Sequence, residues 1–404
     1  MKKVELLAPA GNWEKLEIAI NYGADAVYMS GPDFSLRNYA GNFKSEDLPA
    51  AVKYAHSNGK KVYVTCNIYP RNNELSGIRS FLKIVGDSGA DGIIISDPGV
   101  ILDAKEIIPQ IPIHLSTQAN TTNFRNVQFW EMLGVARINT ARELSLEEIS
   151  EIRRNVGIEI EAFVHGAMCI SYSGRCLLSS FMANRDSNRG LCCHPCRWKY
   201  SVVEEMRPGF YYPLDEDSRG TYIFNSRDIC MIEHIPELIA SGLDSLKIEG
   251  RMKGINYLAP VVKAYREAID SYYTNPDGFK IKDEWIKELE SVNNRGYSKG
   301  FYLNEESDSA PNLSNIKGES DYLLVGKVAT DTSNGKTEVF VRNKICVNDK
   351  LEILSPSKPT SIDTVSAIVT DKGINTDIVQ NGSIASMILQ GSYKKNDIVR
   401  KKVS

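Results

Sequence analysis

Several features that mark common protein classes are missing from the sequence. Its 404 residues contain no run of eighteen apolar residues, which excludes an ordinary membrane-spanning helix. The first residues, MKKVELLAPAG, carry charges where a signal peptide has an apolar stretch, so we expect a protein of the reducing cytoplasm. The net charge is −3, with 42% apolar and 25% charged residues. This composition is that of an ordinary globular protein and argues against one that coats nucleic acid over its whole surface.

Two common catalytic motifs are also absent. The sequence has neither the H-E-x-x-H pair of zinc proteases nor the G-x-S-x-G turn of serine hydrolases. Its cysteines are too crowded for one of them to be interpreted as a nucleophile paired with a base. A peptidase is therefore disfavoured.

Cysteine, in contrast, is concentrated in one part of the chain. Six of the eight cysteines fall in a single stretch, and they are Cys169, Cys176, Cys192, Cys193, Cys196 and Cys230. Cys66 and Cys346 stand alone in strand-like runs, where a small buried apolar residue is expected. The six clustered thiols need a chemical explanation.

Three explanations compete for these thiols. Disulfides are disfavoured in a reducing compartment. Structural zinc usually draws its ligands from paired short knuckles, whereas the intervals here are irregular. An iron–sulfur cluster supplies its own geometry and accepts thiolates from loosely spaced loop positions. We favour iron–sulfur, and zinc remains the alternative.

The cysteine segment (residues 169–200) is locally basic. Asp186 is its one acid, against Arg175, Arg185, Arg189, Arg197 and Lys199. A polyanion could approach this surface. Alternatively, these cations offset the charge of a thiolate-bound cluster or face water.

The first 275 residues alternate short β-rich runs with amphipathic stretches. Eight strands are predicted, at residues 5–11, 26–31, 61–70, 92–99, 113–120, 137–144, 158–167 and 245–250. Helices are predicted between them, the first capped by Asn12. Eight such strands predict a TIM-like (β/α)8 barrel over residues 1–275, with a doubly wound open sheet as the alternative.

The clustered cysteines all follow the seventh predicted strand, and they lie before a helix expected to begin near Asp228 or, for Cys230, at its start. The connection from residue 167 to Asp228 is far longer than usual, and such long connections are generally functional. It would lie on the C-terminal face of a barrel, where barrel enzymes have their active sites. Residues 276–318 are interpreted as a linker with one helix. Residues 319–404, with an Asn334-Gly335 hairpin signal, predict a small all-β barrel domain suited to docking.

Polar residues near the strand ends are candidates for catalysis. His165 is a candidate proton donor, although a lone histidine is often a packing residue. Glu161 shares its strand face and is more simply explained as one half of a structural ion pair. Lys247 and Glu249 lie at the end of the eighth strand, and Arg251 is the candidate for binding a carboxylate or phosphate.

Other strand ends supply candidate substrate-binding residues. Their side chains are amides or guanidinium groups suited to base edges or carboxylates, and they are Asn67, Gln118, Asn120 and Arg142. Arg37, between Phe34 and Tyr39, is a further candidate for contacting an unpaired base, with lid packing as the alternative.

The stretch EAFVHGAMCISYSGRC (residues 161–176) resembles the signature of peptidase family U32, the collagenase-like proteins. Similar matches to this family are LLAPAG (6–11), HLSTQ (114–118), ARELS (141–145), NRGLCCHPCR (188–197), NSRDIC (225–230), KIEGRMK (247–253) and RGYSKGF (295–301). The resemblance covers nearly the whole chain and is looser over the C-terminal domain.

This resemblance implies a cluster-bearing protein that promotes oxygen-independent hydroxylation. The branch with an appended β-domain implies a tRNA partner, 5-hydroxyuridine at the wobble position as product, and prephenate as a small dicarboxylate co-substrate. The implied ligands of a 4Fe-4S cluster are Cys169, Cys176, Cys192 and Cys230, with Cys193 and Cys196 as alternates. Alternative functions are a collagenase-like peptidase or a hydroxylase of another RNA or a small molecule.

Overall fold

The computed structural model describes residues 3–35, 42–169, 171–173, 175–198, 227–303 and 320–403, together with four two-residue strands between residues 202 and 221. These four are β8 (Val202–Val203), β9 (Tyr211–Tyr212), β10 (Glu216–Asp217) and β11 (Gly220–Thr221). No helix within these ranges is both long and apolar enough to cross a membrane.

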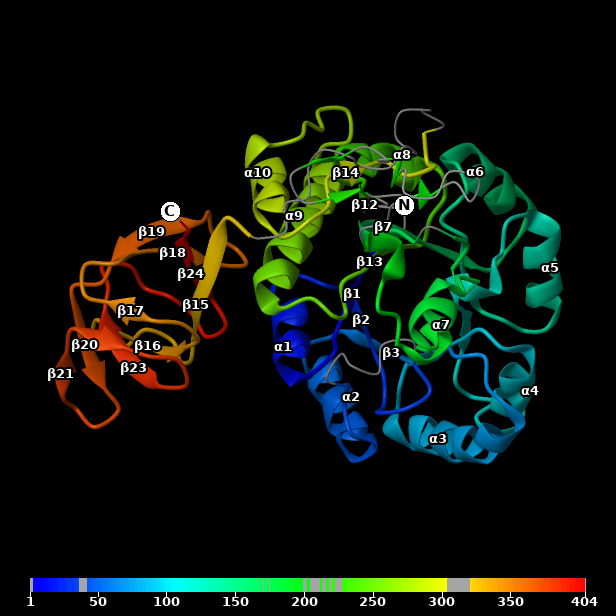
Figure 1. Ribbon diagram of the computed structural model, residues 1–404, viewed down its shortest axis with the longest axis horizontal. Helices are drawn as coiled ribbons and strands as arrows, with labels where there is room; N and C mark the ends of the chain where they lie inside the picture. The colour runs from blue at the N-terminus through cyan, green and yellow to red at the C-terminus, as the bar shows by residue number, and fades with distance from the viewer. Residues whose placement is uncertain are drawn as a thin grey trace.

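Eight parallel strands close into a barrel, as predicted (Figure 1). β13 pairs with both β7 and β1, which completes the ring. The strands are β1 (Glu5–Pro9), β2 (Ala26–Met29), β3 (Lys61–Cys66), β4 (Gly92–Ile95), β5 (Ile113–Leu115), β6 (Arg137–Asn139), β7 (Glu159–Ala167) and β13 (Ser245–Ile248). Most stop several residues before the predicted end, so the polar residues that follow them lie in loops at the barrel mouth.

Helices surround the barrel. Their apolar faces pack onto the outward side chains of the strands, such as Leu6, Val27 and Val64, because burying these residues is the main favourable term in folding. The helices are α1 (Trp13–Asn21), α2 (Leu48–Ser57), α3 (Leu75–Ser88), α4 (Pro98–Ile107), α5 (Phe124–Met132), α6 (Leu146–Asn155), α8 (Ile235–Ala240) and α9 (Ile255–Thr274). Short 3-10 turns are η2 (Ser45–Asp47), η3 (Asn72–Glu74) and η4 (Thr117–Ala119).

Local signals explain where the helices begin. The Asn12 side-chain oxygen accepts a hydrogen bond from the Lys15 backbone N–H at 2.9 Å, which confirms the predicted cap of α1. At α6, Ser145 and Glu148 cap each other's backbone N–H groups in a capping box.

The chain from Asp228 differs from the prediction of a helix. Residues Asp228–Cys230 form β12, which pairs antiparallel with β7, and the turn η7 (Ile232–His234) precedes α8. A further strand, β14 (Tyr297–Ser298), pairs with β12. Three residues are too few to show the two-residue periodicity of a strand, which explains the error.

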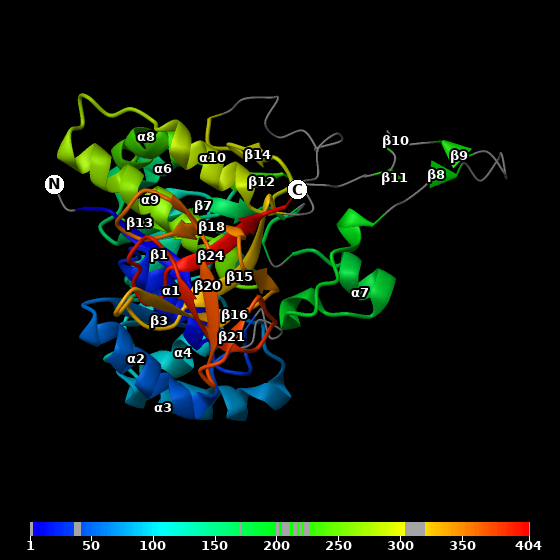
Figure 2. The ribbon, with the colours of Figure 1, turned by 90° about the vertical axis from the view of Figure 1, so that its left-hand side faces the viewer.

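The cysteine segment contains α7 (Leu178–Ala183), η5 (Ser187–Arg189) and η6 (Pro195–Arg197). Figure 2 shows α7 projecting from one end of the barrel. The Asn188 side chain fastens the segment to the loop after β3 by bonding both the N–H and the C=O of Tyr69, each at 3.0 Å. The segment is therefore held over the mouth rather than packed into the core.

The C-terminal domain is all-β, as predicted, and its main sheet is antiparallel and curled (Figure 1). The strand order is β19-β18-β24-β15-β16-β23-β20-β21, and β17 pairs with β22. The strands are β15 (Tyr322–Val328), β16 (Lys336–Val341), β17 (Ile345–Cys346), β18 (Lys350–Leu354), β19 (Ser361–Thr364), β20 (Ala367–Thr370), β21 (Asn375–Thr376), β22 (Ile378–Val379), β23 (Ile384–Ile388) and β24 (Ile398–Lys402). Asn334 and Gly335 both have positive φ in the β15–β16 turn, which confirms the predicted hairpin.

The C-terminal domain is docked on the barrel. The Tyr22 hydroxyl donates to the Leu354 carbonyl at 2.6 Å and accepts from the Ile398 N–H at 3.2 Å. Helix α10 (Asp283–Ser291), within the predicted linker, packs against α9 and pairs its Glu288 with Arg400 of β24. The linker region thus contributes to both the barrel and the domain interface.

Candidate functional site

A cavity of about 280 Å³ lies at the C-terminal mouth of the barrel, and we call it the mouth pocket. Its floor and walls come from strand ends, including Tyr28, Thr65, Asn67, Ser116, Gln118, Asn139, Arg142, Phe163, Lys247, Glu249 and Arg251. Its cover comes from the cysteine segment, including Cys169, Cys176, Cys192, His194 and Cys196. Strand-end polar groups and thiols therefore face the same space.

A larger cavity, of about 700 Å³, lies between α9, α10 and the C-terminal domain. Acidic and basic side chains line it together, and none of its lining residues is a cysteine or histidine. The mouth pocket is the better candidate for chemistry, because it combines thiols, cations and amides at the face where barrel enzymes hold their active sites.

Lys247 forms the cationic floor of the mouth pocket. Its Nζ lies 2.8 Å from Glu161 Oε1 and sits 4.6 Å from the ring centroid of Tyr28. Glu161 also accepts from Asn139 at 3.0 Å and pairs with Arg137 at 3.2 Å. The ion pair fixes the position of the Lys247 ammonium group in the pocket floor.

Glu161 lies beneath the pocket rather than in its lining, and it is fully buried. Burial alone would raise its pKa, but Lys247 and Arg137 outweigh that effect and lower the pKa of Glu161. The carboxylate is therefore ionised at neutral pH. The geometry is that of the structural ion pair that the sequence analysis weighed against a catalytic role.

Two predicted anion-binding arginines line the pocket. The Arg142 guanidinium lies 4.1 Å from the ring centroid of Phe163, and its Nε has no hydrogen-bond partner within the described part of the chain. Arg251 is buried and donates to Thr65 Oγ1 at 3.1 Å and to the Ser35 hydroxyl. Arg251 thus also ties the loop after β2 to β3.

The predicted amides divide between the pocket and its surroundings. Gln118 and Asn67 line the pocket, and the Gln118 oxygen accepts from Ser96 Oγ at 3.0 Å. The Gln118 Nε2 is buried without a hydrogen-bond partner among the described residues. Asn120 instead ends η4 in a left-handed conformation and bonds the Gln118 carbonyl, so it does not reach the pocket.

Glu249 also lines the pocket, where it accepts a hydrogen bond from the Tyr28 hydroxyl at 3.2 Å. Tyr28 is buried, and Phe34 packs against Phe81, so these two rings are engaged inside the protein. Arg37 lies outside the described residues.

His165 lies away from the mouth pocket. Its ring is enclosed by Tyr257, Tyr265 and Tyr297, with centroids 5.3–5.9 Å away, and neither ring nitrogen has a hydrogen-bond partner in the described ranges. Burial lowers its pKa to about 3. A neutral, enclosed imidazole has the geometry of a packing residue rather than that of a proton donor at neutral pH.

Four thiols line the mouth pocket, those of Cys169, Cys176, Cys192 and Cys196. The His194 backbone N–H donates to Cys192 Sγ at 3.4 Å. Cys193 turns away, since its Sγ lies 3.3 Å from Ser179 Oγ of α7. Of the cysteine doublet, Cys192 is thus the member that faces the pocket.

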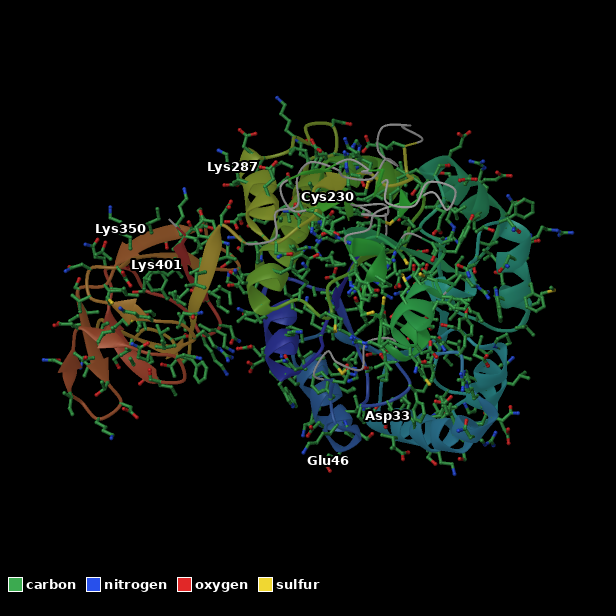
Figure 3. All side chains as sticks on the ribbon, viewed as in Figure 1. Asp33, Glu46, Cys230, Lys287, Lys350 and Lys401 are labelled. Atoms are coloured by element: carbon green, nitrogen blue, oxygen red, sulfur yellow. The ribbon has the colours of Figure 1, made fainter. Side chains whose placement is uncertain are left out.

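Cys230 lies elsewhere, on β12 opposite His165, on the side of the barrel near α9 and α10 (Figure 3). It lines a separate cavity with Leu289 and Tyr297, and burial raises the pKa of its thiol to about 12. The structure therefore brings together three of the four predicted ligands and the alternate Cys196, but not Cys230.

The donor set fits an iron–sulfur cluster in its chemistry, because several thiols from one segment face one pocket. Across the described residues, no three Cys, His, Asp or Glu side chains approach one another closely enough to hold a metal ion.

Some pocket residues were missed by the sequence analysis. Asn139 joins the pocket to Glu161, and Thr65 and Ser116 supply hydroxyls. Asn139 ends β6, so strand alternation from the neighbouring positions could have indicated it. His194, in a left-handed conformation between the cysteines, had no comparable signal.

Comparisons with known proteins extend over both domains. The model of peptidase family U32 matches residues 11–311, and the model of its C-terminal domain matches residues 320–400. The chain is 40% identical over 381 residues to tRNA hydroxylation protein P1 of Bacillus subtilis (strain 168), covering 94% of this chain and 90% of that protein. It is 40% identical over 397 residues to tRNA hydroxylation protein P of Escherichia coli (strain K12), covering 88% and 87%.

Two further similarities are weaker. A collagenase of Porphyromonas gingivalis (strain ATCC BAA-308 / W83) is 29% identical over 378 residues, covering 90% of this chain and 89% of that protein. The solved structure of the U32 peptidase Mk0906 covers 62% of this chain and 94% of its own, with 17% identity and a TM-score of 0.41. On the family matches and the 40% identities, the chain belongs to peptidase family U32.

Proposed function

We propose that this protein is a tRNA-modifying enzyme that hydroxylates the wobble uridine to 5-hydroxyuridine without molecular oxygen. The observation that carries the proposal is the 40% identity, over most of both chains, to proteins named for tRNA hydroxylation. The mouth pocket supports it, because it combines thiols with cations and amides able to hold a base or an anionic metabolite.

We further propose a 4Fe-4S cluster as the cofactor. Cys169, Cys176 and Cys192 would each supply a thiolate from the wall of the mouth pocket. The resemblance assigns the fourth position to Cys230, whereas the structure offers Cys196 on the pocket wall. When bound, such a cluster supplies one-electron chemistry whose potential depends on its ligands and surroundings.

The remaining pocket residues would position substrates. Lys247, Arg142 and Arg251 place three cations around the cavity, and the Gln118 amide N–H has no partner among the described residues. Charge-assisted hydrogen bonds from such groups suit a small dicarboxylate, for which prephenate is our candidate. Glu161 holds Lys247 in place rather than meeting the substrate.

A peptidase is the competing proposal, supported by the 29% identity to a collagenase. The sequence has no zinc-protease or serine-hydrolase motif. The pocket histidine His194 lies between cysteines that face the same cavity, rather than beside one isolated nucleophile. The pocket chemistry therefore favours hydroxylation. A hydroxylase of another RNA or a small molecule is the remaining alternative, and the nucleoside experiment distinguishes it.

The test is mass analysis of tRNA nucleosides from cells that lack the gene. We expect 5-hydroxyuridine and its derivatives to disappear and to return when the wild-type gene is supplied. A Cys176→Ala gene should fail to restore them, whereas a Cys66→Ala gene should succeed, because Cys66 is buried in β3. Unchanged nucleosides in the deletion strain would contradict the proposed substrate.

A further inference from the structure

The cysteine segment exposes an unusual amount of apolar surface. Five of its large apolar side chains are 40–83% exposed, and they are Tyr172, Leu177, Phe181, Met182 and Trp198. We call these five residues the α7 surface. Contiguous exposed apolar patches on soluble proteins generally mark binding sites.

The orientation of α7 explains this exposure. Its small polar residue Ser179 is fully buried and accepts the Cys193 backbone N–H at 3.2 Å. Phe181, two positions along, is thereby directed outward and is 83% exposed. A helix that buries serine and exposes phenylalanine leaves its apolar face available to a partner.

Cations accompany the exposed rings. Arg175 and Arg185 are exposed on the same segment, and the Arg175 guanidinium lies 5.6 Å from the ring centroid of Tyr69. Counted over residues 169–200, five Lys and Arg stand against one Asp. Apolar rings interleaved with cations complement a partner that has flat bases and phosphates, because every base has a face that can stack and every phosphate is negative.

We propose that the α7 surface is a platform on which unpaired RNA nucleotides stack beside the mouth pocket. This inference rests on the proposed function. It adds that the protein recognises a single-stranded loop of the RNA rather than a paired helix. α7 projects from the mouth end of the barrel (Figure 2), where a nucleotide extending from the platform would meet the pocket. A paired helix would offer its phosphates but keep its base faces stacked internally.

The test measures binding of the full-length protein to a stem–loop RNA and to a fully paired RNA of equal length. We expect wild type to prefer the stem–loop, and Phe181→Ala to weaken stem–loop binding about tenfold while leaving duplex binding unchanged. Phe181→Trp should retain the affinity, because it keeps a ring for stacking. Phe129→Ala is the matched control, since Phe129 is 51% exposed on α5.

Three results would overturn the platform. Phe181→Ala could bind the stem–loop as tightly as wild type, or it could lose stem–loop and duplex binding equally. Light scattering could also show that Phe181→Ala converts a dimer into a monomer, which would make a second copy of the chain the occupant. Failure of the proposed function is distinguishable, since it would leave tRNA nucleosides unchanged in the deletion strain.

Discussion

At the residue scale, the buried Glu161–Lys247 pair determines whether the pocket floor is charged. We expect Glu161→Gln to lower the free energy of unfolding by about 3–5 kcal/mol, because it removes the carboxylate with which the buried Lys247 pairs. Arg137 keeps its ion pairs with Glu5 and Glu159. Urea denaturation of the two proteins measures the difference. Glu106→Gln is the control, since Glu106 is an exposed surface partner of Arg79.

The same pair predicts a pH dependence with a definite sign. The pKa of Glu161 is lowered in the folded protein, so its stabilising contribution is fully present above the ordinary glutamate pKa of about 4.3. The contribution is lost as the pH falls through the lower folded value. The stability difference between wild type and Glu161→Gln should therefore shrink in acid. A difference that stays constant down to the acid transition would contradict an ionised Glu161.

Among the cations of the mouth pocket, Arg251 is our main candidate for binding the anion. We expect Arg251→Ala to weaken prephenate binding by about 1.5–3 kcal/mol, the contribution of a charge-assisted hydrogen bond. Calorimetry measures it, with Arg79→Ala on the outer helix α3 as the control. We also expect Arg251→Ala to be less stable than wild type, because Thr65 and Ser35 lose a buried hydrogen-bond donor. Unchanged prephenate affinity would remove Arg251 from the site.

At the scale of the elements, the sequence predicted the strands well and their ends poorly. Periodicity located all eight barrel strands, because buried apolar residues repeat along them. The polar residues after β5 continue the alternating sequence pattern, but Gln118 lies in η4 and Asn120 follows it as the C-cap. Only the fold decides that Gln118 enters the pocket and Asn120 does not. His165 illustrates the same limit, since its aromatic enclosure comes from residues at least 92 positions away in sequence.

Iron binding by cysteine variants tests which thiols hold the cofactor, including Cys230 on the short strand β12. We predict that alanine at Cys169, Cys176 or Cys192 abolishes iron binding, whereas Cys66→Ala and Cys346→Ala leave it intact, since these two thiols lie in strands away from the pocket. Iron per chain in anaerobically purified protein measures this. The family resemblance also predicts that Cys230→Ala removes iron. This outcome requires β12 and the cysteine segment to approach each other. Wild-type iron in Cys230→Ala, with loss in Cys196→Ala, would assign the fourth position to Cys196.

At the scale of the whole molecule, the two domains share a buried interface rather than a flexible joint. Leu354 and Ile398 of the C-terminal domain belong to the apolar core of the barrel, and the Tyr22 hydroxyl bonds both of their backbones. Arg400 is buried between Glu288 of α10 and Glu352 of β18. Removing the domain would therefore expose apolar surface on the barrel and leave Glu288 without its partner.

The C-terminal domain is also the more basic part of the chain. From residue 320 onward it carries twelve Lys and Arg against nine Asp and Glu, whereas the whole chain has a net charge of −3. Lys350 and Lys401 lie on its strands β18 and β24 (Figure 3). A chain ended near residue 315 should keep its iron, because every candidate ligand precedes residue 231. It should bind tRNA more weakly and with a shallower salt dependence, because phosphate contacts are lost.

Filter binding across a salt titration, with iron measured on the same samples, checks this expectation. The exposed interface makes folding a necessary control, so the near-ultraviolet circular dichroism of the shortened chain must match a folded barrel. Loss of iron from a folded, shortened chain would show that the C-terminal domain supports the cysteine segment. An unchanged salt slope would instead place the phosphate contacts on the barrel, where Arg175 and Arg185 flank the α7 surface. In that case one segment would supply both the thiols and the RNA contacts.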